Sequence, residues 1–317
     1  YVFGCTSFVI FHVALFQDLF SKCYDELGCV EADSRWYDKK LRPVNLIPMD
    51  RHIIKTDFLL MKLNNSHLTT TMLSNSPDVN IISVDWQRGA EPPYDQAISN
   101  ARVVALEIIA LLKELKEKFH MNFGKICIIG HGVGAHIAGY VGTVYNNIKK
   151  ITGLDPSGPR FEGLPDIVKL NPTNARYVEV IHTDAYDARS QGTKETMGHS
   201  DFYINDAFIQ PGCPVNKSFS DLASVERNTL NEGEILPGCS HKRSFKYFIE
   251  SMFNGKCIFL GIKCNNYEDF AKGKCATCGK SDSLCRTFGI QTYKSSKQKS
   301  SYFLNTADHS PYCSEYK

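Results

Sequence analysis

The segment KICIIGHGVGAHIAGYVG, residues 125–142, has the pattern of a buried strand, a tight glycine turn and a helix. A turn of this kind with the sequence GxSxG presents a catalytic serine, because the sharp bend exposes the central side chain. Here the central position of GHGVG is Gly132, which has no hydroxyl. The segment therefore predicts a nucleophile turn without its nucleophile. The alternatives are an ordinary strand-to-helix connection and an anion cradle, since glycine permits both.

Two further residues follow this turn in the order of a catalytic triad. Asp155 lies in TGLDPSGP at the end of the next predicted strand, and His241 lies much later, in CSHKRSFKYF. The order of turn, acid and histidine is typical of α/β hydrolases. In such a site the imidazole accepts the proton of the nucleophile, and the buried carboxylate fixes the tautomer of the imidazole. Taken singly, Asp155 could be a helix cap and His241 a surface residue, but together they predict a hydrolase site.

The elements that must position these residues alternate between strands and helices. Apolar residues at helical spacing predict a helix over residues 93–119, and GAHIAGYVG predicts a second over 134–142. Apolar runs predict strands in TDFLLMKL (56–63), VNIISVDW (79–86, a buried strand), KICIIG (125–130), KITGLDP (150–156) and YVEVIHTD (177–184). Because such alternation favours a mostly parallel sheet in an α/β fold, we expect the chemistry at the carboxyl ends of the strands.

Length and composition indicate a globular protein. The 317 residues can form one large core, or one core with a small appendage. Hydrophobic residues make up 43% of the chain and charged residues 22%, which is typical of a folded rather than a disordered chain. A net charge of +2 gives no support to a nucleic-acid partner or a strongly acidic substrate. Any contact with a membrane is therefore expected to be hydrophobic and local.

The twelve cysteines are clustered in the sequence. Short separations suit disulfides, which persist in an oxidising compartment and restrict the unfolded chain. The alternative is a zinc site built on CATC, residues 275–278, with Cys264 and Cys285 as further thiolates. We favour disulfides because other features of the chain are typical of a secreted protein.

The first residues contain the apolar run YVFGCTSFVIFHVALFQ, which is too short to span a bilayer. Residues 1–20 are typical of the end of a signal peptide whose initiating methionine and basic region are missing, and a buried first helix is the alternative. Asn64 in NNS and Asn216 in NKS are glycosylation sequons, which fit the secretory route. We therefore expect an extracellular protein with no transmembrane span, in which residues 21–317 form one domain.

The sequence resembles the pancreatic lipase family, the secreted animal triacylglycerol lipases and phospholipases A1. The resemblance extends from about Cys23 to Tyr302. It rests on the sequence motifs CYDELGC, VDW, YDQAISNARVV, GHGVGAHIAG, ITGLDPSGP, VIHTDA, GHSDFYIN and CSHKRSFKYF. It implies an α/β hydrolase fold that acts at a lipid–water interface. By this resemblance Asp155 and His241 match the family's catalytic acid and histidine, and the backbone amide of Val133 matches one donor of its oxyanion hole.

The segment from Cys213 to Cys239 resembles the family's lid, a disulfide-bounded loop that covers the active site until it meets a lipid surface. A plain surface loop is the alternative. Cys127, in the middle of KICIIG, is expected to be a free, buried thiol, and Cys257 and Cys313 are left unassigned, to pair with each other or with a further domain. We expect the disulfides Cys213–Cys239, Cys23–Cys29, Cys264–Cys275 and Cys278–Cys285.

Two departures from the family concern catalysis. Because Gly132 stands at the nucleophile position, no acyl-enzyme can form there. The family also has a strand ending in HG, between its equivalents of FLLMKL and VNIISVDW, that supplies an oxyanion-hole amide. Here NNSHLTTTMLSNSPD stands in that place, so one central strand and the second oxyanion donor are expected to be missing. Either the neighbours of this strand close up, or the sequence is a spliced or mis-assembled gene product.

Two other departures concern a metal and a domain. The family's calcium loop has acidic side chains where this chain has Asn171 and Asn174, while Asp166 keeps the matching acidic position. Amides retain oxygen ligands but remove charge, so a calcium site here would be weak and we expect no bound metal or cofactor. The family's C-terminal β-sandwich, which docks colipase in pancreatic lipases, is expected to be absent because the sequence stops at Lys317.

These observations predict a secreted protein of triacylglycerol or phospholipid metabolism whose catalysis is impaired and which binds lipid or a protein partner. The serine-less yolk proteins of flies are similar in that they resemble lipases without hydrolysing esters. One alternative is an active carboxylic ester hydrolase whose sequence carries an error at Gly132 and at the missing strand. Another is a splice product without function.

Overall fold

The computed structural model describes most of the chain between Ser21 and Cys313. The described residues are 21–31, 35–42, 47–61, 80–187, 189–214, 238–252, 258–275, 277–279, 284–290, 292 and 299–313. Several predictions fall outside these ranges, namely those on the signal segment 1–20, on Asn64 and Asn216, on Cys257 and on the interior of the expected lid.

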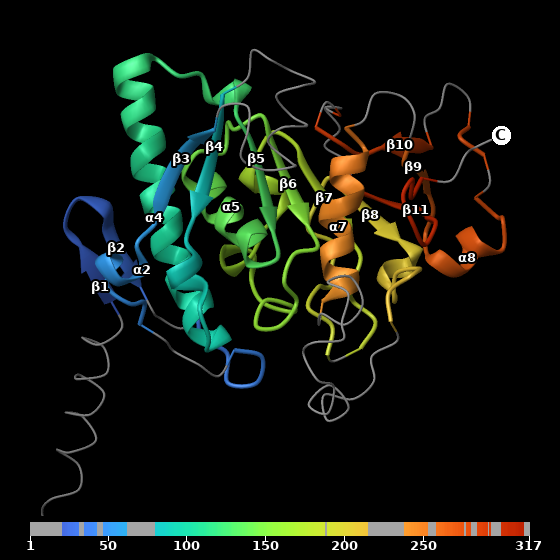
Figure 1. Cartoon of the computed structure of the whole chain (residues 1–317), viewed down its shortest axis with the longest axis horizontal. Helices are drawn as coiled ribbons and strands as arrows, with labels where there is room; N and C mark the ends of the chain where they lie inside the picture. The colour runs from blue at the N-terminus through green and yellow to red at the C-terminus, as the bar shows by residue number, and fades with distance from the viewer. Residues whose placement is uncertain are drawn as a thin grey trace, which may run out of the picture.

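The centre of the fold is a seven-stranded sheet with the order β10-β9-β11-β8-β7-β6-β5 (Figure 1). The five neighbouring strands β5, β6, β7, β8 and β11 run parallel to one another. At the far edge, β9 is antiparallel to β11, and β10 is antiparallel to β9. The expected mostly parallel sheet is therefore confirmed. The strands are β5 Cys127–His131, β6 Lys150–Leu154, β7 Val178–His182, β8 Ser200–Ile204, β9 Leu260–Lys263, β10 Cys285–Thr287 and β11 Ser300–Leu304.

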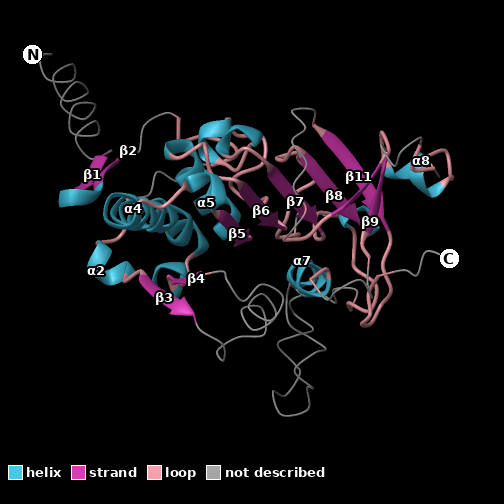
Figure 2. Cartoon of the chain, turned by 90° about the horizontal axis from the view of Figure 1, so that it is seen from above, coloured by secondary structure: helices cyan, strands magenta, loops and turns pink. Residues whose placement is uncertain are grey.

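Helices cover both faces of this sheet. Helix α5 lies against one face at β5 and β6, α4 packs along α5, and α7 crosses the opposite face (Figure 2). The α-helices are α2 Arg51–Ile54, α4 Tyr94–Phe119, α5 Val133–Val144, α7 Cys239–Glu250 and α8 Tyr267–Ala271. Short 3₁₀ helices are η1 Asp25–Leu27, η2 Gln87–Ala90, η3 Phe123–Lys125, η4 Asp166–Val168, η5 Pro172–Asn174 and η6 Asn205–Ala207. The two helices predicted from sequence, α4 and α5, are confirmed.

Two hydrophobic cores form because successive side chains of a strand point to opposite faces. On β7, Val178 and Val180 belong to the core beneath α4 and α5, whereas Ile181 belongs to the core beneath α7. On β6, Ile151 and Leu154 divide in the same way. The central strands are thus apolar on both faces, which explains why their sequences are continuous apolar runs.

The hairpin of β3 Asp57–Met61 and β4 Ile81–Asp85 is separate from the large sheet. In the described part of the chain, β5 pairs with β6 alone. The position on the other side of β5, where the family has a further strand, therefore has no strand among the described residues. The prediction that β4 is buried is wrong, since Ile82 is 38% exposed. The reason is that β4 belongs to a two-stranded sheet and not to the interior of the large one.

The structure contains the four expected disulfides, Cys23–Cys29, Cys213–Cys239, Cys264–Cys275 and Cys278–Cys285. The four cysteines around CATC are therefore not the thiolates that a zinc site requires. Cys313 is also disulfide-bonded. Cys127 is a free thiol as predicted, but it is exposed and not buried, because β5 is the last strand of the large sheet.

A buried ion pair joins the middle of the sheet to its far edge. Lys150 on β6 and Glu179 on β7 are almost fully buried, and Lys150 Nζ lies 2.8 Å from Glu179 Oε1. The same ammonium donates to the backbone oxygens of Gly289 and Thr292 at 2.6 and 2.9 Å, and to the Thr292 hydroxyl at 3.0 Å. The segment that follows β10 is thereby fixed to the two central strands.

We expect Lys150→Met to lower the free energy of unfolding by about 3–5 kcal/mol, because it leaves the Glu179 carboxylate buried without a counter-charge. Urea denaturation followed by tryptophan fluorescence measures this loss. The double variant Lys150→Met with Glu179→Gln removes both charges and should be clearly more stable than the single variant. A single variant that lost less than about 1 kcal/mol would show that the pair is not needed for stability.

Candidate functional site

The turn between β5 and α5 has the backbone of a nucleophile turn. Gly132 has φ 57° and ψ −122°, between the end of β5 at His131 and the start of α5 at Val133. Its N–H donates to the backbone oxygen of Leu154 on β6 at 3.0 Å, which ties the turn to the neighbouring strand. A residue with a side chain is strained at such a φ, at a cost of about 1–3 kcal/mol, whereas glycine adopts it freely.

A second glycine allows the strand and the helix to approach each other. A Cβ at Gly130 would lie 2.2 Å from the backbone oxygen of Gly134, in the first turn of α5. No side chain fits at that distance. Gly130 is therefore required by packing and Gly132 by its backbone conformation, whereas a Cβ at Gly134 would meet no atom within 4 Å. The first two glycines of GHGVG support a nucleophile turn over an ordinary connection.

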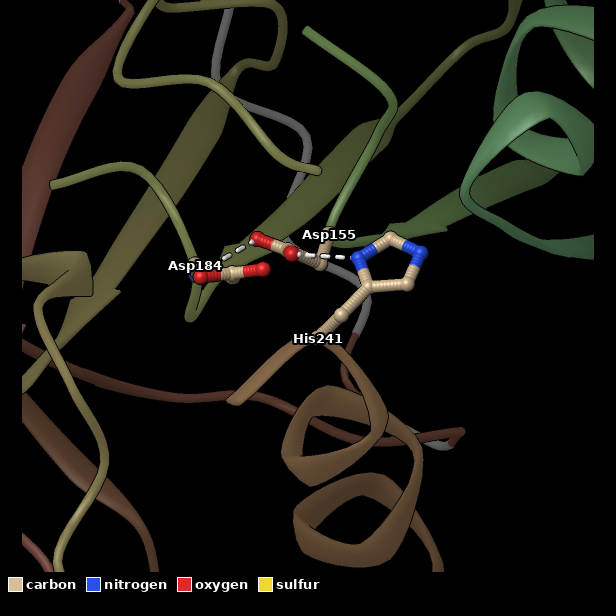
Figure 3. Close-up of side chains that lie close together, drawn as sticks. All are labelled: Asp155, Asp184 and His241. Atoms are coloured by element: carbon tan, nitrogen blue, oxygen red, sulfur yellow. Dashed lines mark hydrogen bonds and ion pairs between the residues drawn. The ribbon is translucent and has the colours of Figure 1, made fainter. Parts of the chain in front are cut away.

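Asp155 follows β6 directly and is fully buried. Its Oδ1 accepts hydrogen bonds from the backbone N–H groups of Thr183 and Asp184 at 2.7 and 3.1 Å, just beyond the end of β7. Its Oδ2 lies 2.6 Å from His241 Nδ1 (Figure 3). The carboxylate is thus held at both oxygens, which fixes the direction in which it faces the imidazole.

His241 lies in the first turn of α7, where Gly238 precedes the helix. Because the Asp155 carboxylate accepts at Nδ1, the imidazole carries its proton on Nδ1 and leaves the Nε2 lone pair free to act as a base. A Cβ built on Gly132 would lie 3.0 Å from His241 Nε2. The structure therefore brings the three predicted positions together, with the imidazole directed at the place where a serine side chain would be.

One hydroxyl lies close to this place. Ser157 Oγ is 3.4 Å from the position of a Cβ at Gly132, and Ser157 itself is buried. It belongs to the turn that carries Asp155. Its proximity makes Ser157 the control residue for any activity measured at this site.

Sequence reasoning did not identify His131 as part of the site. Its ring packs against that of His241 with centroids 4.1 Å apart, and its Nε2–H donates to the His241 backbone oxygen at 3.1 Å. Burial and the neighbouring His241 lower the pKa of His131 to about 4. His131 is therefore neutral at neutral pH and supports the first turn of α7. The signal in the sequence was its place beside Gly132 in GHGVG.

Asp184 was also missed, although the strand YVEVIHTD was seen to end in an acidic residue. It is the third member of a buried group with Asp155 and His241, whose ligand atoms lie within 4.8 Å of one another (Figure 3). Asp155 and His241 already engage each other and two backbone amides, so this group is a hydrogen-bonded acid–histidine pair rather than a ready metal site. Burial, and then the charge of Asp155, raises the pKa of Asp184.

The remaining predicted site residues are placed as follows. Val133 begins α5, where a helix leaves its first N–H groups without partners in the helix, so this amide is available as one oxyanion donor. The segment expected to lack the second donor, residues 62–79, lies outside the described residues. The disulfide at the base of the expected lid joins Cys213 to Cys239, and Cys239 is the first residue of α7, two positions before His241.

We expect Asp184→Asn to raise the melting temperature at pH 7–8 by about 2–4 °C, as about 1 kcal/mol does in a domain of this size. A carboxyl with a raised pKa stabilises the fold most when protonated, below its ordinary pKa, and this stability is lost as the pH rises through the folded-state pKa. The gain should therefore shrink towards pH 4. The amide oxygen of asparagine can still accept from the Gln191 N–H, as Asp184 does at 3.1 Å.

Thermal unfolding of both proteins from pH 4 to 8 measures this difference. Asp187→Asn is the matched control, because a hydrogen bond from Arg189 lowers the pKa of that carboxyl and its replacement gives no gain. A gain from Asp184→Asn that did not change with pH would contradict the assignment.

Comparison with known proteins identifies the family. Residues 64–312 match the family model described as Lipase. The chain is 31% identical to Inactive pancreatic lipase-related protein 1 of Mus musculus, over 90% of this chain and 70% of that protein. It is 32% identical to Pancreatic triacylglycerol lipase of Mus musculus, over 91% of this chain and 71% of that protein. With its parallel sheet and the turn, acid and histidine in hydrolase order, the chain belongs to the pancreatic lipase family and has an α/β hydrolase fold.

Proposed function

We propose that this protein is a secreted member of the pancreatic lipase family that binds lipid esters without hydrolysing them at an appreciable rate. One observation carries the proposal, which is that His241 Nε2 is directed at Gly132, a residue with no hydroxyl to give up a proton. In a serine hydrolase the imidazole accepts the proton of the nucleophile as an acyl-enzyme forms. With Gly132 at this position no such intermediate can form, although the rest of the turn is in place.

The comparisons do not by themselves decide between an active and an inactive protein. The identity to an inactive lipase-related protein is 31% and that to a pancreatic triacylglycerol lipase is 32%, which is no meaningful difference. The residue at position 132 therefore decides. The names of these relatives support a lipid-ester ligand, and the disulfides support an oxidising, extracellular location. Among the described helices, none is long and apolar enough to cross a membrane.

A second candidate is an active ester hydrolase whose sequence carries an error at Gly132. The observation that favours it is the Asp155–His241 pair, which keeps the hydrogen bond that catalysis requires. Resequencing the transcript separates the two candidates. A serine codon at position 132, with a restored HG strand in the segment 62–79, would decide for the enzyme.

We expect the protein to float with a triolein emulsion and to release no fatty acid from it. Removing the nucleophile of a serine hydrolase reduces turnover by a factor on the order of 10⁶, because the triad acts as a unit. Flotation by centrifugation and titration of fatty acid measure the two parts. Ser157→Ala is the control, and a residual activity that disappeared in this variant would assign the chemistry to Ser157. Turnover that a fluorophosphonate blocked would contradict the proposed lack of hydrolysis, and protein that stayed in the aqueous phase would contradict lipid binding.

We expect Gly132→Ser to lower the melting temperature and to restore only feeble esterase activity. The new Cβ is strained at φ 57° and lies 3.0 Å from His241 Nε2, so the imidazole must move back by several tenths of an ångström. The second oxyanion donor is expected to be missing, and the loss of one such donor reduces the rate by a further factor of about 10²–10³. Hydrolysis of p-nitrophenyl butyrate and thermal unfolding are the measurements.

Gly132→Ala is the matched control, because alanine introduces the same Cβ without a hydroxyl. Both variants should lose similar stability, and only the serine variant should gain activity. Grafting the HG strand back into Gly132→Ser should increase the activity further. Turnover comparable to that of a pancreatic lipase in the single variant would show that the loss is confined to position 132.

A further inference from the structure

The loop that carries η4 and η5 packs against α5 and corresponds to the segment in which the family's calcium loop was expected. Its two asparagines are buried, with Asn171 at 5% and Asn174 at 2% exposed, whereas Asp166 and Thr173 are exposed. A hollow of about 230 Å³ lies beside it, and its lining includes Thr143, Asp166, Asn171 and Asn174. We propose that side-chain amides of this loop occupy the role of a calcium ion, so that the fold of this chain is independent of calcium.

The amide of Asn171 has its orientation fixed by its neighbours. Its Nδ2 donates to the backbone oxygens of Asp166 and Lys169 at 2.9 and 3.3 Å. Its Oδ1 accepts from the Thr173 N–H at 2.9 Å and from the Thr173 hydroxyl at 2.6 Å. A carbonyl needs a donor and an N–H needs an acceptor, so the reverse orientation would place like groups against each other. The NH₂ group therefore satisfies two backbone oxygens that a cation could otherwise coordinate.

Asn174 completes the network and links it to α5. Its Oδ1 accepts from the Asn171 backbone N–H at 2.8 Å, and its Nδ2 donates to the Thr143 hydroxyl on α5 at 3.2 Å. Both asparagines thus use donors as well as acceptors. A carboxylate offers only acceptors, so an aspartate at position 171 would turn an oxygen towards the two carbonyls unless a cation stood between them.

These contacts do not fit a calcium site. Calcium takes six to eight oxygen ligands, usually with several carboxylates. Here the amide oxygens of both asparagines already accept hydrogen bonds from the loop itself. Asp166 is the only acidic side chain in the lining of the hollow. Lys169 is ion-paired with Glu195, so the Glu195 carboxylate already has a cationic partner. Within the described residues, the one group of three close acidic or imidazole ligands is that of Asp155, elsewhere in the fold.

The network matters because this loop supports the helix that begins at the nucleophile turn. The Leu170 N–H donates to His136 Nδ1 at 3.1 Å, and the Tyr140 hydroxyl donates to the Val168 oxygen at 2.6 Å. Both side chains belong to α5. Burial lowers the pKa of His136 to about 3, so it stays neutral and can accept this hydrogen bond. The loop that the two amides order therefore contacts α5 through its backbone as well as through Asn174.

The proposal is tested by thermal unfolding of the full chain in EDTA and in millimolar CaCl₂. For the protein as it stands, we expect the same melting temperature in both buffers. A rise of more than about 3 °C in CaCl₂, which corresponds to a stabilisation of the fold by about 1 kcal/mol, would overturn the proposal.

Two variants test which asparagine carries the role. Asn171→Asp should lower the melting temperature in EDTA by about 3 °C or more, and CaCl₂ should restore it, because the new carboxylate faces the oxygens of Asp166 and Lys169. Asn174→Asp should also lower the melting temperature, because it buries a charge and the Thr143 hydroxyl already donates to the Gly139 oxygen. CaCl₂ should not restore it, since the oxygen of residue 174 faces the Asn171 N–H and not a pair of carbonyls.

Asn147→Asp is the matched control, because it makes the same chemical change at an exposed turn outside the hollow. Its melting temperature should be unchanged in both buffers. If Asn171→Asp behaved like this control, the amide of Asn171 would not have the role assigned to it. If Asn171→Asp folded only in CaCl₂, the proposal would be supported. Should it fold in neither buffer, the comparison of the unaltered protein in the two buffers remains decisive.

Discussion

The hydrogen bond of 2.6 Å between His241 Nδ1 and Asp155 Oδ2 joins the carboxyl end of β6 to the first turn of α7. The other oxygen of Asp155 binds the backbone that follows β7, so one carboxylate connects three elements. A buried carboxylate is costly unless its acceptor positions are filled. The imidazole thus fills an acceptor position of the buried carboxylate and contributes to the fold. This explains how an acid–histidine pair can keep its geometry beside a glycine that offers it no hydroxyl.

The glycine itself removes a constraint from the turn. A side chain at φ 57° would be strained, and a Cβ there would press on the imidazole at 3.0 Å. With Gly132 both effects are absent, and the imidazole lies close to the backbone of the turn. The strand, turn and helix that present a nucleophile in a lipase are present here as β5, Gly132 and α5. The backbone of the turn is unstrained because glycine stands at its centre. The glycine thus removes the nucleophile without disturbing the acid–histidine pair beside it.

Much of the fold could be predicted from the sequence, since β5, α5, β6 and β7 are local apolar patterns and the disulfides link cysteines that are close along the chain. The two wrong predictions concern the burial of strand residues, which depends on the neighbouring strands in a sheet. The exposure of Cys127 and Ile82 depends on which strands lie beside β5 and β4, and no local pattern carries that information.

The candidate site divides in the same way. Sequence motifs and their order along the chain were enough to find the turn at Gly132, Asp155 and His241. The roles of His131 and Asp184 could not be predicted in this way. That of His131 depends on the packing of its ring against His241, and that of Asp184 on the ends of β6 and β7 lying side by side. The orientation of the Asn171 amide likewise requires the positions of two carbonyls that are set by the folded loop.

The disulfide between Cys213 and Cys239 has a mechanical consequence. It closes the chain between these residues into a covalent ring, and one end of the ring is the first residue of α7. His241 stands two positions further along the same helix. A force on the ring would therefore act on the helix that carries the imidazole without passing through the sheet. The disulfide-closed ring and the Asp155–His241 pair are thus joined through the backbone of a single helical turn.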